Sequence, residues 1–449
     1  MTNAQLAIDP ERPTMAPKGW KRIRILVCAD FLILMLVLFT SLLARFGTDW
    51  PKSFSNYLGG FAIASCLHLL VYYFGELYEP APRIGAKLWL PRISALTSIA
   101  ILIEATFTLA TGTYLMPRGN LLVLWIFGSL GVNFNRWLSR RLRTRRFGIP
   151  RVLLVGSKQD IKLGKDHIRE CGSRVIIVGE LEKVSHLADE IELAQTTDVL
   201  LLSGGLLKEI YPNPLEELEL RRVGVFQRIV PSDTLLGLRR SLQIAGMPFI
   251  ALRAHTLSTS RFHFKRFTEA FYLWVLSVPI LLLTLLTGLY IRSVAGSGII
   301  HKQERVGKFG EKFQMLKFRT MHHDAEELTG ITKAEKNDSR VIPGLQWIRK
   351  SRLDELPQFW NVAKGEMSII GPRPERPDFT SEYESLIPGY GRRHDIPPGI
   401  TGLAQVSGHY HTDPSYKLGH DLQYLVNWSP ILDAQILTRT IWVVLTGRT

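Results

Sequence analysis

The chain has 449 residues, 46% of them hydrophobic, and carries a formal net charge of +15. That length exceeds what one compact core organises and predicts two or three domains. An apolar composition combined with excess positive charge is typical of a protein that sits in lipid and handles anions. The long apolar runs described below argue against nucleic acid as the partner for that charge. The three cysteines, Cys28, Cys66 and Cys171, have no metal-site or disulfide spacing, so we expect the soluble parts to be cytoplasmic.

Four apolar segments fill the first third of the chain, each close to the roughly 20 residues that a helix needs to cross a bilayer. They are approximately Ile25–Ala44, Tyr57–Leu77, Ile93–Met116 and Leu121–Leu138. Basic residues precede the first segment, fill the loop between the second and third, and follow the fourth, whereas the opposite loops carry only Arg45, Lys52 and Arg118. The positive-inside rule then places both ends of the four-span bundle, residues 1–146, in the cytoplasm. No small-residue cleavage site follows the first segment, so we interpret it as a retained span.

Three ionisable side chains, Asp30, His68 and Glu104, lie within these spans. Such groups are costly in a bilayer and are often functional. Nothing else in the sequence suggests an ion path, so we expect each to pair with a neighbour at a helix interface.

Residues 147–260 change to a soluble α/β pattern and predict a Rossmann-like module. Short buried-strand runs occur at Arg151–Gly156, Val175–Gly179, Asp198–Leu202 and Val223–Val230. Polar, helix-compatible stretches between some of them favour a parallel sheet. The glycine after the first run is followed by S-K-Q-D and lacks the other glycines of a dinucleotide-binding loop. A module without a cofactor is therefore favoured over a working nucleotide site.

A fifth apolar segment, Phe267–Ile291, is long enough to span a membrane but has basic residues on both flanks. Pro279 lies near its middle, where a proline removes a backbone hydrogen bond and kinks a helix. Ser277 could help satisfy a carbonyl that the kink frees. We therefore predict a re-entrant helix that enters the inner leaflet, turns, and leaves on the cytoplasmic side.

The last part of the chain, residues 261–449, is dense in glycine, proline and paired charges. Its strings are Gln303–Gly307 (Q-E-R-V-G), Lys317–Met321 (K-F-R-T-M), Leu353–Gln358 (L-D-E-L-P-Q), Gly371–Pro374 (G-P-R-P) and Pro398–Gln405 (P-G-I-T-G-L-A-Q). Rigid loops of this kind commonly carry function.

The physical interpretation centres on Asp354 and Glu355. Pro357 suits the first turn of a helix that can run from Gln358 to Lys364 and end at Gly365. The two carboxylates would then precede a helix amino terminus, where anions are favoured. One can attack phosphorus as a nucleophile while the other helps to hold Mg²⁺. The alternative is an acidic helix cap without a chemical role.

Cationic side chains crowd the same part of the chain. They favour the catalytic interpretation over the acidic helix cap, because arginine forks match phosphate oxygens. They are Arg305, Lys317, Arg319, Arg340, Arg349, Arg352 and Arg373. His322 and His323 lack other ligands at metal spacing, so we expect them to be solvated.

Together these strings resemble the bacterial sugar transferase family, the monotopic phosphoglycosyl transferases. The resemblance covers about Lys265 to Thr449, and the preceding spans and α/β module are similar to the long form of the family. It implies transfer of phospho-sugar from a UDP-sugar to undecaprenyl phosphate with release of UMP, at the bacterial inner membrane, in exopolysaccharide, capsule or O-antigen synthesis.

The resemblance also implies site residues. Asp354 would be the nucleophile of a ping-pong route, Glu355 would assist Mg²⁺ binding, and Ser277 and Pro279 would mark the break of the re-entrant helix. The family usually has aspartate where Glu269 stands.

The expected architecture is thus a four-span membrane α-helical bundle, a Rossmann-like α/β module and a mainly α monotopic catalytic domain with a re-entrant helix. The alternative function is a non-catalytic, membrane-bound binding or regulatory protein that retains a transferase-like domain. The sequence does not distinguish glucose, galactose or an N-acetyl sugar as the transferred group. The spans and the α/β module could build a homodimer.

Overall fold

The fold is described from a computed structural model of the chain. It describes residues 20–47, 50–79, 84, 89–171, 175–221, 223–230, 233, 242–252, 257–322, 340–407 and 413–446. His323, which we expect to be solvated, lies outside these residues.

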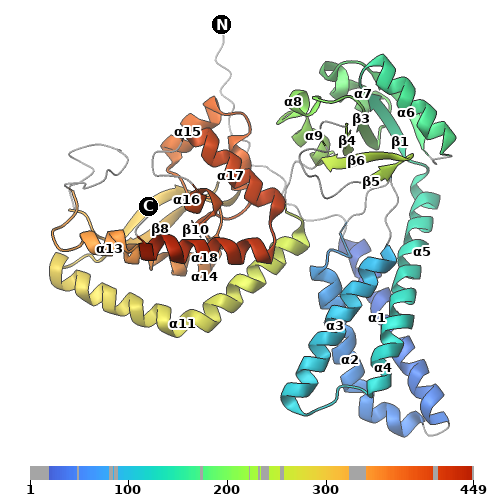
Figure 1. Cartoon of the computed structure of the whole chain (residues 1–449), viewed down its shortest axis with the longest axis horizontal. Coiled ribbons are helices and arrows are strands. Elements are labelled where there is room, and N and C mark those ends of the chain that lie inside the picture. The colour runs from blue at the N-terminus through green and yellow to red at the C-terminus, as the bar shows by residue number, and fades with distance from the viewer. Residues whose placement is uncertain are drawn as a thin grey trace. The chain divides into compact units, whose positions relative to one another are not determined.

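The N-terminal part is a group of long apolar helices (Figure 1). They are α1 (Trp20–Phe46), α2 (Trp50–Phe74), α3 (Trp89–Thr111), and α4 (Arg118–Val123), which continues through the π-helical turn η2 (Leu124–Gly128) into α5 (Ser129–Phe147). Four helical stretches here, and α11 later in the chain, are long and apolar enough to cross a membrane. The predicted segments lie on these helices, although α2 ends at Phe74 and α3 at Thr111, before the predicted limits.

Two pairs of ionisable side chains are buried among these helices. Arg136 contacts Asp30 at 2.6 Å, and the Tyr78 hydroxyl donates to the same carboxylate at 2.9 Å. His68 lies 3.1 Å from Glu104, and both side chains are almost fully buried. The prediction that these three ionisable groups pair with neighbours is confirmed.

The α/β part contains a six-stranded sheet in the order β2-β1-β3-β4-β6-β5. The strands are β1 (Arg151–Val155), β2 (Ile176–Leu181), β3 (Asp198–Leu201), β4 (Gly224–Arg228), β5 (Leu242–Ile244) and β6 (Met247–Leu252). The helical segments are α6 (Lys158–Glu170), η3 (Val184–His186), α7 (Leu187–Leu193), α8 (Leu207–Ile210) and α9 (Leu215–Leu220).

This sheet is mixed and not purely parallel. β1, β3 and β4 are parallel, as predicted, but β6 pairs with β4 in the antiparallel direction. Leu153, Val199 and Val225 of the parallel strands are buried, which explains their continuous apolar runs. The sequence analysis missed β5 and β6, which are separated only by Ala245 and Gly246 with positive φ.

Helix α11 (Thr259–Ala295) begins the C-terminal part and is longer than the predicted Phe267–Ile291. Ser258 caps its start by accepting a hydrogen bond from the Arg261 amide at 3.4 Å. Pro279 lies inside the helix, which continues past it and is bent into a wide V (Figure 1). The re-entrant path through a membrane stays a prediction.

After α11 the chain forms a hairpin of β7 (Ile300–Val306) and β8 (Lys312–Phe318), joined through η4 (Lys308–Gly310). A second small sheet pairs β9 (Ser368–Ile370) with β10 (Gly399–Thr401) in parallel. The helical segments are α13 (Gln346–Lys350), η5 (Leu353–Glu355), α14 (Gln358–Lys364), α15 (Pro377–Leu386), η6 (Tyr390–Asp395), α16 (Leu403–Ser407), α17 (Pro414–Asn427) and α18 (Pro430–Thr446). Met315, Val362, Ile370 and Tyr424 share one apolar core, which holds the hairpin, α14, β9 and α17 together.

The three domain limits, 1–146, 147–260 and 261–449, stay predictions.

Candidate active site

The site is built on the contact between β8 and α14. Asn361 on α14 is buried, and its amide donates to the Gln314 carbonyl at 2.8 Å. Its carbonyl oxygen accepts the Leu316 amide at 3.0 Å. These two bonds fix the helix against the strand and bring Lys317 beside Glu355. The predicted helix is confirmed from Gln358 to Lys364, and Gly365 ends it with φ 88°.

Glu355 is surrounded by cations. Its carboxylate lies 3.2 Å from Lys317, 3.4 Å from Arg373 and 3.7 Å from Arg352. Burial favours the neutral carboxyl, but the charges of Lys317, Arg373 and Arg352 outweigh it and lower the pKa of Glu355 to about 2. Glu355 is therefore ionised over the whole physiological range.

Lys317 lies where a second anion besides Glu355 would stabilise its charge. Burial lowers the pKa of its ammonium group even though Glu355 acts in the opposite direction, and the nearby Arg373 and Arg305 lower it further. A second anion in this place, such as a phosphate, would offset that excess of positive charge.

Asp354 differs from its neighbour. It is 8% exposed and makes no hydrogen bond or ion pair within the described part of the chain. Burial and the charge of Glu355 raise its pKa to about 6, against the opposing charges of Lys317, Arg349 and Arg373. Asp354 is thus a desolvated carboxylate without a fixed partner among the described residues. Arg352 precedes the pair with a left-handed backbone (φ 57°), a strained conformation that often occurs at functional sites.

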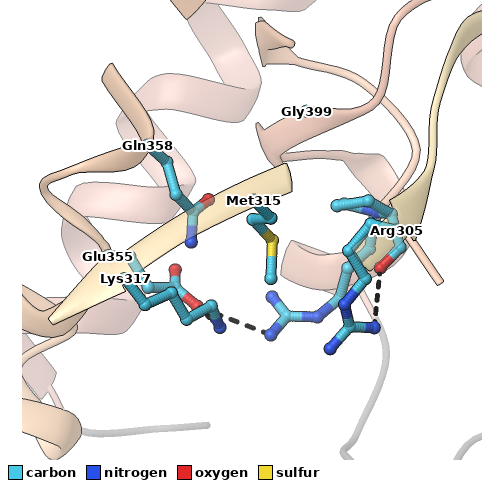
Figure 2. A pocket seen from close by; sticks show the side chains of 8 residues that line it. Arg305, Met315, Lys317, Glu355, Gln358 and Gly399 are labelled. Atoms are coloured by element: carbon cyan, nitrogen blue, oxygen red, sulfur yellow. Dashed lines mark hydrogen bonds and ion pairs between the residues drawn. The ribbon is translucent and has the colours of Figure 1, made fainter. Parts of the chain in front are cut away.

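A hollow opens beside this pair (Figure 2). Its lining consists of Arg305, Met315, Lys317, Glu355, Gln358, Arg373, Pro374 and Gly399. Figure 2 shows Lys317 and Glu355 next to each other, with Gln358 above them and Arg305 on the opposite side. Asp354 is not among the lining residues, although it directly precedes Glu355.

The structure gathers five of the seven predicted phosphate-binding residues around the carboxylates. Arg305, Lys317 and Arg373 line the hollow, Arg352 contacts Glu355, and the charge of Arg349 acts on Asp354.

The other two arginines have different surroundings. Arg319 donates to the Ala295 carbonyl at 2.5 Å and so satisfies the end of α11. Arg340 pairs through its own carbonyl with the His322 amide at 3.0 Å. Neither lines the hollow.

The residues at the predicted helix break also have defined partners. Ser277 donates to the Trp274 carbonyl at 2.8 Å, within α11.

At the start of the helix, Lys265 contacts Glu269 at 2.8 Å and Asp433 at 3.5 Å, and Ser368 also donates to Glu269. This buried cluster joins α11 to β9 and α18, a role that only the i, i+4 spacing of Lys265 and Glu269 could have indicated.

The side chains around the hollow fit a Mg²⁺ ion that is bound mainly through substrate phosphates. The described residues contain no group of three or more His, Cys, Asp or Glu side chains that could hold a metal alone. Mg²⁺ usually takes one or two protein carboxylates and completes its shell with substrate phosphates and water. Glu355 at the edge of the hollow meets that requirement.

The end of the parallel strands in the α/β part is filled by side chains of the protein itself. Asp160, at the start of α6, accepts hydrogen bonds from Ser157 at 2.8 Å and Ser203 at 2.6 Å, and from Arg228 at 3.0 Å. The bond from Ser203 is the main cause that lowers the pKa of Asp160. A carboxylate therefore occupies the place where α/β sheets commonly bind phosphate, which favours a module without a nucleotide.

Comparison with known proteins identifies the C-terminal part. Residues 260–447 match the family model described as bacterial sugar transferase. This part of the chain belongs to that family. The match contains all five strings, from Gln303 to Gln405.

Individual relatives of this sugar transferase region act on several sugars, according to their names. An Aeromonas hydrophila UDP-N-acetylgalactosamine-undecaprenyl-phosphate N-acetylgalactosaminephosphotransferase is 41% identical over 177 residues, 38% of this chain and 42% of the relative. A Klebsiella pneumoniae UDP-glucose:undecaprenyl-phosphate glucose-1-phosphate transferase is 35% identical over 208 residues, 45% of this chain and 44% of the relative. The chain thus spans less than half the length of these two relatives.

A Caulobacter vibrioides protein with the same name as the Klebsiella relative is 37% identical over 169 residues. The aligned residues are 36% of this chain but 63% of that protein. A shorter chain can therefore carry this region.

Proposed function

We propose that the chain transfers a sugar-1-phosphate from a UDP-sugar to undecaprenyl phosphate, giving undecaprenyl-diphosphate-sugar and UMP. The product would start the synthesis of an exopolysaccharide, a capsule or an O-antigen. The observation that carries the proposal is the pair Asp354 and Glu355, in which cations fix one carboxylate and the other has no fixed partner.

The reaction has two displacement steps at one phosphorus. A carboxylate oxygen of Asp354 attacks the phosphorus that bears the sugar, and the bond from that phosphorus to the oxygen of UMP breaks. A phosphate oxygen of undecaprenyl phosphate then attacks the same phosphorus and displaces the Asp354 carboxylate. Glu355 is a poor candidate for the nucleophile, because three cations hold its charge.

The cations around the hollow stabilise the charge that develops on the transferred phosphate. Lys317, Arg305 and Arg373 line the hollow and can contact phosphate oxygens as substrate enters. Mg²⁺, when bound by Glu355 and the substrate phosphates, supplies further positive charge.

The membrane arrangement follows from the same chemistry. UDP-sugars are dissolved in the cytoplasm, whereas undecaprenyl phosphate presents its phosphate at the membrane surface. A re-entrant α11 would hold the site at headgroup level on the cytoplasmic face of the inner membrane, where both substrates are accessible. The exposed apolar side chains of α11, such as Trp274 and Leu281, suit insertion into lipid.

Release of UMP tests the proposal. Purified chain is incubated with undecaprenyl phosphate, Mg²⁺ and, in turn, UDP-glucose, UDP-galactose and UDP-N-acetyl sugars. We expect turnover with one of them, and no turnover after Asp354→Asn because the amide does not attack phosphorus. Asp378→Asn, an exposed carboxylate on α15, is the matched control and should retain activity.

Two results would overturn the proposal. If no sugar nucleotide gives UMP while the protein binds it, the chain is the non-catalytic binding protein. If Asp354→Asn turns over like wild type, the nucleophile is misassigned.

A further inference from the structure

The backbone that carries Arg373 is fixed at four successive carbonyl groups, those of residues 372–375. Each accepts a hydrogen bond from a different part of the chain, at 2.8 to 3.1 Å. The Gly399 amide donates to the carbonyl of residue 372, and the Arg393 side chain donates to that of residue 373. The Arg305 side chain donates to the carbonyl of residue 374, and the Val306 amide donates to that of residue 375. The Arg373 side chain leaves this rigid segment and reaches Glu355 at 3.4 Å.

Arg393 differs from the other donors because it is a buried charge outside the hollow. It is 4% exposed and lies on η6, where it pairs with Asp421 of α17 at 2.8 Å. One terminal nitrogen donates to the Tyr390 hydroxyl at 2.5 Å, and the other donates to the Arg373 carbonyl at 3.0 Å. Removing a charge from water is costly, and here the Asp421 carboxylate and the two oxygen acceptors stabilise the buried Arg393 charge.

We propose that Arg393 is a positioning residue for the transfer reaction, acting through the Arg373 carbonyl to hold the Arg373 guanidinium against Glu355 and the entering phosphate. This inference rests on the proposed function. The role requires a fork that contacts a carboxylate, a hydroxyl and a carbonyl together. Lysine carries the same charge, but it is a point donor that does not reproduce that planar geometry.

A double-mutant cycle separates this role from a general contribution to folding. Arg393→Lys retains the charge opposite Asp421 and loses the fork, and Arg373→Ala removes the side chain that Arg393 positions. We expect Arg393→Lys alone to lower kcat/KM for the UDP-sugar about tenfold, the effect of losing one charged hydrogen bond. In the Arg373→Ala background the same change should alter kcat/KM less than about twofold, because the guanidinium is already absent.

Arg392→Lys is the matched control. Arg392 is buried on the same helix and pairs with Asp395 at 3.5 Å, and its side chain makes no bond to residues 372–375 in the described part of the chain. Arg392→Lys should change kcat/KM by the same factor in the wild-type protein and in the Arg373→Ala variant. If Arg393→Lys does not fold, the combined change Arg393→Gln and Asp421→Asn removes both charges of the pair and takes its place in the cycle.

Calorimetric binding of UDP to the full chain and its variants gives a second readout that does not require turnover. Equal effects of the Arg393 change with and without Arg373, in both kcat/KM and UDP affinity, would overturn the inference and leave the proposed function intact. Coupled effects on UDP affinity without UMP release would support the positioning of Arg373 by Arg393 for nucleotide binding and overturn the proposed transfer.

Discussion

Asp354 and Glu355 are adjacent in sequence, but they experience opposite electrostatic environments. Glu355 lies within 3.7 Å of three cations, and Asp354 has none at that distance among the described residues. Burial and the charge of Glu355 raise the pKa of Asp354 to about 6, whereas the charges of Lys317, Arg373 and Arg352 outweigh burial and lower the pKa of Glu355 to about 2. Each shift has a measurable consequence.

The first consequence is a pH dependence of the rate. The attacking group must be the ionised carboxylate, so the rate of UMP release should rise about tenfold per pH unit below about pH 6 and level off above it. Glu355 is already ionised throughout this range and adds no second inflection. Initial rates at UDP-sugar concentrations well below KM, which report kcat/KM and so the free enzyme, check this between about pH 4.5 and 8. A flat profile would show that Asp354 is not the titrating nucleophile.

The second consequence is an opposite effect of the two amide variants on stability. The pKa of Asp354 in the folded protein, about 6, exceeds its ordinary value of 3.8. Ionisation of Asp354 therefore destabilises the folded state as the pH rises from 3.8 to about 6. Asp354→Asn should therefore stabilise the protein at pH 7, by up to about 3 kcal/mol. Glu355 has a folded pKa below its ordinary 4.5, so its contribution to stability is present above that pH and is lost as pH falls toward 2. Glu355→Gln should destabilise.

Thermal unfolding of the detergent-solubilised variants at pH 7 measures both changes. Asp378→Asn, on the exposed face of α15, should shift the midpoint little. Midpoints that move in the same direction for the two amide variants would contradict this electrostatic account.

At the scale of elements, α11 is longer than a bilayer core is thick. A straight helix of 37 residues would be about 55 Å long, whereas the bilayer core is about 30 Å thick. Pro279 lies near the middle and lacks the amide that would bond the Val275 carbonyl. Ser277 bonds Trp274 and not that carbonyl.

Pro279→Ala should restore the missing bond and straighten α11 toward a full span. If the C-terminal part stays cytoplasmic but is tilted, loading of Asp354 from UDP-sugar should persist better than transfer to lipid, and labelled phospho-sugar should accumulate on the protein. If the helix inverts, both half-reactions should fail together. Unchanged half-reactions and topology would mean that the proline does not position the site.

At the scale of the whole molecule, the predicted topology places both flanks of α11 on one side of the membrane. In a chain whose three native cysteines are replaced, His263→Cys before the apolar core and Ser297→Cys after it offer exposed labelling sites. An impermeant thiol reagent added to intact cells should label neither, and both should react after the membrane is opened. Labelling of the later site in intact cells would mean that α11 crosses the membrane.

The family match locates the sugar transferase region in the C-terminal part of the chain. It covers residues 260–447, which contain Asp354 and the whole lining of the hollow. The homodimer built by the spans and the α/β module stays a prediction.

The sequence by itself determined the features that depend on local interactions. Apolar runs of about 20 residues located the candidate spans, and Pro357 and Gly365 bounded α14, because hydropathy and helix caps act over a few residues. The strings of residues 303–374 identified the family, and the paired carboxylates within them identified the candidate site.

Only the tertiary structure decided which charges meet. Lys317 and Arg319 are two residues apart and would share a face if the strand continued, but β8 ends at Phe318 and Arg319 turns to the end of α11. Arg393, 20 residues from Arg373, lacked a recognisable motif yet holds its carbonyl. The difference between Asp354 and Glu355 arises from burial and from the cations around Glu355. Arg352 is three residues from Glu355, but Lys317 and Arg373 are 38 and 18 residues away, so no local pattern encodes their contacts.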